Sequence, residues 1–115
     1  MQHAALFIEV YDSKEAERFL AVLSVGLLKS VADGVMSLAE AERLLFTPRT
    51  VRILSEKSAS PELCQLISEC CELEDVLDLV PAKFESEVVR ILAGFLSYLE
   101  KTDAQDPYAD HVKIS

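Results

Sequence analysis

The amino-acid sequence predicts an all-α protein, built as a compact bundle of five to six helices. Apolar residues recur at three- and four-residue spacing, helix-start signals appear repeatedly, and only three glycines and four prolines interrupt the chain. Its 115 residues have the length of one domain. We therefore expect residues 1–115 to form a single helical domain, with a polar tail from about residue 103.

A long first helix is predicted up to about Asp33. Asp12 followed by Glu15 has the spacing of a capping box, and Gly34 suits the left-handed position that ends a helix. Its apolar positions recur every four residues, at Phe19, Leu23, Leu27 and Val31. Further apolar residues widen this stripe, so that most sides of the helix are apolar. This surplus predicts a central position in the bundle, or a homodimer through the first long helix.

Shorter helices follow at regular signals. Ser37 with Glu40 opens a helix through Phe46, and the pairs Thr47-Pro48 and Ser60-Pro61 open the next two. Residues 72–79 predict one or two further turns. Pro81 is expected to open the last long helix, whose inner face is Phe84, Val88, Ile91, Leu92, Phe95 and Leu99. Gly26 and Gly94 inside helices predict a close approach between the first long helix and the last.

The two chain ends allow two interpretations. Residues 5–11 and 110–115 are rich in β-branched and aromatic side chains and alternate weakly, which favours a short terminal β-ribbon. Such a ribbon is marginal alone but stable when packed on helices. The alternative extends the first helix back towards Ala4, and periodicity does not decide between them.

Charge is distributed unevenly along the chain. Eleven Lys and Arg against twenty Asp and Glu leave a net charge of −9, which argues against nucleic acid or an anionic membrane as a partner. Residues 1–57 carry seven basic and eight acidic side chains, whereas residues 58–115 carry four and twelve. This acidic half favours a basic protein partner. The candidate partner-binding residues are Glu69, Glu72, Glu74, Asp75 and Asp78.

The sequence also predicts a cytoplasmic protein. Its first residues lack the positive region of a secretory signal, and the charge-free run at residues 19–28 is too short to span a bilayer. The three cysteines, Cys64, Cys70 and Cys71, are an odd number with two adjacent, which fits a reducing compartment.

No motif for catalysis or metal binding is present. The glycines are isolated, so no phosphate-binding loop is predicted, and two adjacent cysteines are poorly placed to share one zinc ion. We therefore expect no catalytic residue, no cofactor and no metal. A weaker enzyme hypothesis would place a cleft around Cys70.

Residues 37–54 resemble the helix-turn-helix of small transcription regulators. This resemblance implies an alternative function, a DNA-associated regulator that uses Arg49 and Arg52. The match is degenerate, because the turn is one residue short, Phe46 stands where glycine is usual, and Glu42 replaces a small alanine. The charge from residue 30 to residue 57 is also zero, without the surplus that phosphate contacts need.

A set of short motifs resembles a small bacterial family of uncharacterised proteins of about this length. The motifs are Gly26-Leu27-Leu28, Gly34-Val35-Met36-Ser37, Glu40-Ala41-Glu42, Leu44-Leu45-Phe46-x-Pro48, Glu72-Leu73-Glu74-Asp75-Val76 and Leu79-Val80-Pro81. They span most of residues 13–90. The resemblance implies a bacterial origin and a single domain, and it carries no activity or site. The leading hypothesis is a non-enzymatic interaction protein, immunity- or antitoxin-like, that binds a basic partner.

Overall fold

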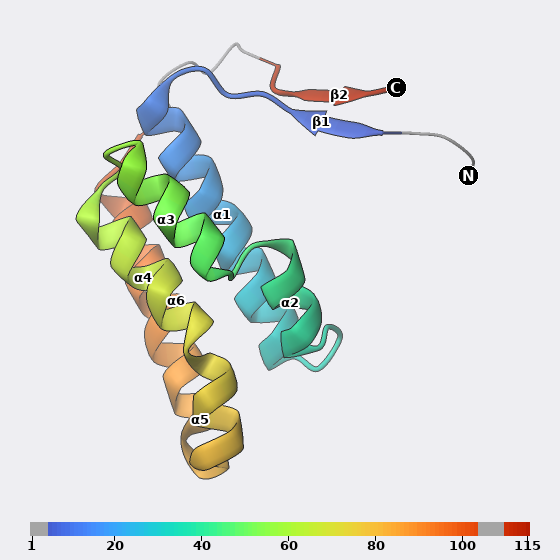
Figure 1. Ribbon diagram of the computed structural model, residues 1–115, viewed down its shortest axis with the longest axis vertical. Helices are drawn as coiled ribbons and strands as arrows, with labels where there is room; N and C mark the ends of the chain where they lie inside the picture. Colours follow the sequence, from blue (N-terminus) through green and yellow to red (C-terminus); the bar gives the residue numbers. More distant parts are fainter. Residues whose placement is uncertain (1–4, 104–109) are drawn as a thin grey trace.

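A computed structural model of the chain describes residues 5–103 and 110–115, and these are mostly helical (Figure 1). The elements, in chain order, are β1 (Leu6–Ile8), α1 (Ser13–Ala32), α2 (Leu38–Leu44), α3 (Pro48–Glu56), α4 (Pro61–Cys71), α5 (Leu73–Leu79), the 3₁₀ turn η1 (Pro81–Lys83), α6 (Phe84–Glu100) and β2 (Val112–Ile114). The helical class is therefore confirmed.

The bundle itself has four helices where five to six were expected, and two further helices are short. Four helices of nine residues or more, α1, α3, α4 and α6, form the body of the described chain. The remaining helices, α2 and α5, have seven residues each. The helix expected through Phe46 ends at Leu44, because Leu45 and Phe46 turn inward and are buried in the core.

Three helix starts confirm the capping residues predicted from the sequence. The Asp12 carboxylate accepts a hydrogen bond from the Glu15 backbone N–H at 2.9 Å at the start of α1. Ser37 Oγ accepts from the Glu40 N–H at 3.1 Å, and Thr47 Oγ1 caps α3 in the same way. At the other end of α1, Gly34 has a φ of 75°, the left-handed conformation that suits glycine.

Helix α4 starts at Pro61 as expected, whereas the start of α6 differs from the expectation. The Ser60 side chain makes no capping bond at α4; instead its backbone N–H donates to the Glu17 carboxylate of α1. Pro81 opens the 3₁₀ turn η1, and α6 begins only at Phe84. A distant carboxylate replaces the local cap in the first case, which no local pattern could reveal.

The longest helices, α1 and α6, pack antiparallel and make the most extensive contact in the molecule. In Figure 1, α3 and α4 lie in front of this pair, and α4 also packs on α6. Arg18 of α1 ties the end of α6, because its Nη1 donates to the carbonyls of Leu99 and Thr102 at 3.1 and 2.9 Å. The largest fully buried side chains of the core are Phe46, Phe95, Leu28, Leu63, Ile67, Leu73 and Ile91.

The two helical glycines behave differently: the expected close helix–helix approach is present at Gly94, with α4 in place of α1, and absent at Gly26. A Cβ on Gly94 would lie 2.6 Å from Leu66 Cδ2, so the helix that comes close is α4. A Cβ on Gly26 would meet nothing within 4 Å. Only Gly94 therefore serves close packing inside this chain.

The two chain ends form the predicted antiparallel ribbon, with shorter strands than expected. Leu6 pairs with Ile114, Phe7 with Lys113 and Ile8 with Val112. Residues 5–11 contain no helix, so the extension of the first helix through them is wrong. Of the tail expected from about residue 103, residues 104–109 lie outside the described residues.

Candidate functional site

Helix α5 lies at one end of the molecule, far from the ribbon that joins the chain termini (Figure 1). The chain leaves α4 at Glu72, which has helical dihedral angles but provides no side-chain cap for α5. Leu73 is the one buried residue of α5 and anchors it on the body. A short helix held by one apolar side chain presents most of its surface to solvent.

Four of the five predicted partner-binding residues occupy this exposed end. Glu72, Glu74, Asp75 and Asp78 are all exposed, on α5 or directly before it. Within the described part of the chain, which includes every Lys and Arg, none of the four forms an ion pair. The structure thus brings together the carboxylates that the sequence places between residues 72 and 78.

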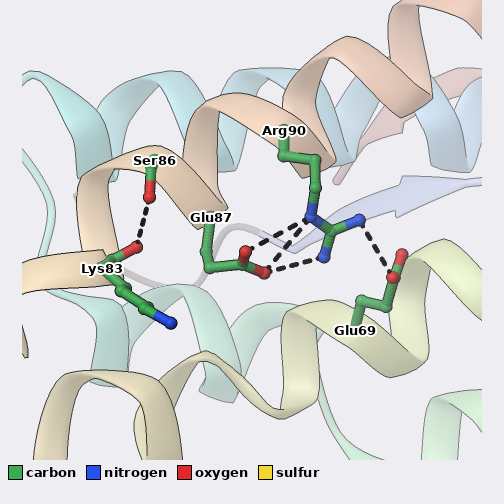
Figure 2. Close-up of polar contacts among 5 residues, drawn as sticks. All are labelled: Glu69, Lys83, Ser86, Glu87 and Arg90. Carbon is green, nitrogen blue, oxygen red and sulfur yellow. Dashed lines mark hydrogen bonds and ion pairs between the residues drawn. The ribbon is translucent and has the colours of Figure 1, made fainter. Parts of the chain in front are cut away.

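Glu69, the fifth predicted residue, is placed differently. It is half-buried on α4, and its Oε1 lies 3.1 Å from Nη1 of Arg90 on α6 (Figure 2). The same guanidinium donates to Glu87 at 2.8 Å, which lowers the pKa of the Glu87 carboxyl. Glu69 is therefore used inside the chain to join α4 to α6. We remove it from the candidate surface.

Glu42 joins the acidic end from a different helix. It lies on α2, and partial burial, followed by the negative charges of Glu74 and Asp78, raises the pKa of its carboxyl. The sequence analysis missed this residue as a site. A signal existed, because Glu42 follows the buried Leu38 by four residues and so lies on the same side of α2. We call Glu42, Glu72, Glu74, Asp75 and Asp78 the acidic end.

The field of the acidic end reaches a neighbouring thiol. Burial raises the pKa of Cys71 first, and the charges of Glu42 and Glu72 raise it further. Both effects favour the neutral thiol, because a thiolate there would be desolvated and would face two carboxylates. The raised pKa of Cys71 therefore indicates that the negative potential of the carboxylates extends to the end of α4.

Exposed apolar side chains lie among these acids. Leu77 and Leu79 of α5 are exposed, as is Val80 directly after it. Leu79 is 79% exposed, more than its neighbours, and nothing in the described chain covers it. A surface that combines carboxylates with exposed leucines has the chemistry to bind a basic, amphipathic segment.

The arginines of the DNA-binding alternative lie on α3. Arg49 and Arg52 are exposed on α3, and Arg43 of α2 lines a shallow hollow with Arg49 and Ile53. None of the three arginines forms an ion pair with the described residues. The structure does not test binding to DNA, and this alternative stays a prediction.

The cysteine at the centre of the enzyme hypothesis is inaccessible. Cys70 is fully buried in the core, and this burial raises the pKa of its thiol far above the ordinary value. A neutral, enclosed thiol is a poor nucleophile. Because Cys70 is fully buried, it offers the weaker enzyme hypothesis no accessible nucleophile. Among the described residues, no three His, Cys, Asp or Glu side chains are grouped to hold a metal ion.

The fold and this surface define a small, mostly helical protein with a terminal ribbon and an acidic end. A family model described as a protein of unknown function, DUF3969, matches residues 11–112, so the chain belongs to this family. The resemblance to a family without an assigned activity is confirmed, over a longer stretch than residues 13–90. Comparison with curated proteins and with solved structures finds no match. None of the helices described here is long and apolar enough to cross a membrane.

Proposed function

We propose that this protein is a non-enzymatic, cytoplasmic interaction protein that binds a basic protein partner through its acidic end. The partner's segment carries lysines or arginines together with apolar side chains. An immunity- or antitoxin-like role, in which the protein occupies a basic surface of its target, fits this chemistry.

One observation carries the proposal: burial and the neighbouring Glu74 and Asp78 raise the pKa of the Glu42 carboxyl, and no lysine or arginine of the described residues pairs with any of the three. Like charges brought together repel, by a few tenths of a kcal/mol per exposed pair. Repulsion of this size is tolerated on a solvated surface. Lysines or arginines of a basic partner would replace it with attraction, which favours binding at this end.

A defined peptide tests the proposal. The probe is a fluorescent helical peptide of lysines and leucines, and fluorescence anisotropy measures its affinity. Asp75→Asn with Asp78→Asn should weaken binding about fivefold, because two favourable charge contacts are lost. Added salt should remove most of this difference, since the contacts are exposed.

A matched control separates the acidic end from the overall charge of −9. Glu56→Gln with Asp110→Asn removes the same charge from exposed residues outside α5. This variant should bind the peptide nearly as well as the wild-type protein. Equal affinities of the two variants would show that only net charge matters, and the proposed site would be wrong.

A further inference from the structure

Helices α1 and α6 carry apolar side chains that are about half exposed in the described structure. Val22 of α1 is 51% exposed, and Val89 and Leu96 of α6 are 62% and 47% exposed. Both helices are free of charge in their central parts, over residues 19–28 and 91–99. We call Val22, Gly26, Val89 and Leu96 the α1–α6 face.

The antiparallel packing of the two helices brings these residues to similar levels along the α1–α6 pair. Arg18 near the start of α1 contacts Leu99 near the end of α6. At the other end, Val31 lines a shallow hollow together with Glu85 and Val89. Val22 therefore lies at the level of Leu96, and Gly26 lies about one turn further along α1. Figure 1 shows α1 and α6 behind α3 and α4.

Gly26 has no role inside the monomer. Glycine within a helix costs about 1 kcal/mol relative to alanine. A Cβ at Gly26 would meet nothing within 4 Å, and the residue itself is exposed. The absence of a side chain there leaves room for the backbone of another helix to approach closely.

The charges at the edge of the face are self-complementary. Lys29 of α1 lies near the end where Glu85 of α6 lies; its Nζ is 3.2 Å from Asp33 of the same helix, and its side chain stays 66% exposed and open to a second carboxylate. Glu85 forms no ion pair with the described residues. If α1 packed on the partner's α1, Glu85 would face the acidic Glu100 end of the partner's α6. If α1 packs on the partner's α6, Lys29 of each copy faces Glu85 of the other. The second arrangement pairs opposite charges twice.

We propose that the protein forms a symmetric dimer in which α1 of each copy packs on α6 of the other through the α1–α6 face. The occupant of the face is a second copy of this chain, because its edge charges match each other under this twofold symmetry. Within the monomer, Val22 and Leu96 stay about half exposed and a Cβ on Gly26 would meet nothing, so these residues are accessible to the second copy. The acidic end lies outside this interface, so the dimer does not depend on the proposed partner.

Sedimentation velocity over a wide concentration range tests the dimer on the full chain. The wild-type protein should sediment as a dimer of its 12.8 kDa chain near physiological ionic strength, where charges are screened beyond about 8 Å. Val22→Glu should remove the dimer at every concentration used, while circular dichroism shows unchanged helix content. Leu79→Glu is the matched control on α5, and this variant should remain dimeric. A monomeric wild-type protein, or a dimeric Val22→Glu variant, would overturn the proposal.

A charge exchange tests the arrangement itself. Lys29→Glu and Glu85→Lys should each weaken self-association about tenfold, because each places like charges opposite one another twice. An equal mixture of the two variants should recover dimers, since both contacts then join opposite charges. If the mixture stays monomeric, or if neither variant is weakened, α1 does not pack on the partner's α6 and the proposal fails.

Discussion

Glu42 shows how a single side chain can depend on residues far away in the sequence. Its own helix, α2, leaves it half-buried, and α5 brings Glu74 and Asp78 into its neighbourhood. Glu69 shows the converse, because Arg90 pairs with it from a helix 21 residues further along the chain. The sequence gives the residue type at both positions, but it does not reveal which distant residues lie next to them.

The raised pKa of Glu42 predicts a pH-dependent gain in stability from Glu42→Gln. The folded protein holds the Glu42 proton to a higher pH than the unfolded chain does, so the charged carboxylate destabilises the fold once pH exceeds the folded pKa. Removing the charge should raise the free energy of unfolding at pH 7 by a few tenths of a kcal/mol. The gain should decrease as the pH falls and vanish below the ordinary glutamate pKa of about 4.3.

Urea unfolding at pH 7 and at low pH measures this effect. Glu56→Gln, on the exposed last turn of α3, serves as the control and should change little at either pH. A loss of stability in Glu42→Gln at pH 7 would mean that the carboxylate is satisfied and that the repulsion with α5 does not exist.

At the scale of the elements, local signals determine where most helices begin. Asp12, Ser37 and Thr47 cap the residue three positions later, and a bond across three residues can be recognised in the sequence. Ser60 could not be interpreted in this way, since its partner Glu17 is 43 residues away. Helix starts are predictable when their capping bonds are local.

The close contact between α4 and α6 predicts the effect of Gly94→Ala. The new methyl group would lie 2.6 Å from Leu66 Cδ2, so the buried leucine must shift. Overpacking of this kind costs about 1–3 kcal/mol, and the better helix propensity of alanine returns about 1 kcal/mol. We expect a net loss of about 1 kcal/mol in the free energy of unfolding.

Gly26→Ala is the matched comparison, because the same substitution in α1 meets open space. It should stabilise the monomer by about 1 kcal/mol in dilute protein, where self-association does not contribute. Chemical denaturation of both variants measures the difference. Equal effects of the two substitutions would show that the approach of Leu66 to Gly94 is not a packing constraint.

On the scale of the whole molecule, Arg18 joins segments that are more than 80 residues apart. Its Nη1 donates to the Leu99 carbonyl and to both the carbonyl and the hydroxyl of Thr102. These carbonyls end α6, where the helix leaves acceptors without intrahelical donors and where a positive charge is favourable. One arginine of the first helix therefore fixes the end of the last.

Arg18→Met keeps most of the apolar stem of the side chain but removes the three donated bonds. The α6 carbonyls would then depend on water, and the site is partly buried. We expect a loss of about 2 kcal/mol in the free energy of unfolding, measured by urea denaturation. Arg52→Met, at an exposed position of α3, should change stability by less than about 0.5 kcal/mol. Similar losses in both variants would contradict the role of Arg18 in closing α6.

The ribbon also belongs to the whole molecule, because it joins the two ends of the chain. Alternation along residues 5–11 and 110–115 indicated strands, yet the pairing of Leu6 with Ile114 depends on where the helices carry the chain ends. Its polar face includes Glu9 and Lys113, whose charged groups lie 3.5 Å apart. The tendency to form a strand depends on neighbouring residues, whereas the pairing of the two strands depends on how the rest of the chain folds.

The sequence by itself determined the helical class, most helix boundaries and the acidic character of residues 72–78, because periodicity, caps and charge act over a few neighbouring residues. Only the tertiary structure decided that α4 approaches Gly94, that Glu69 is paired with Arg90, and that Glu42 joins α5. These outcomes depend on which helices pack together, and packing is set by contacts between residues tens of positions apart.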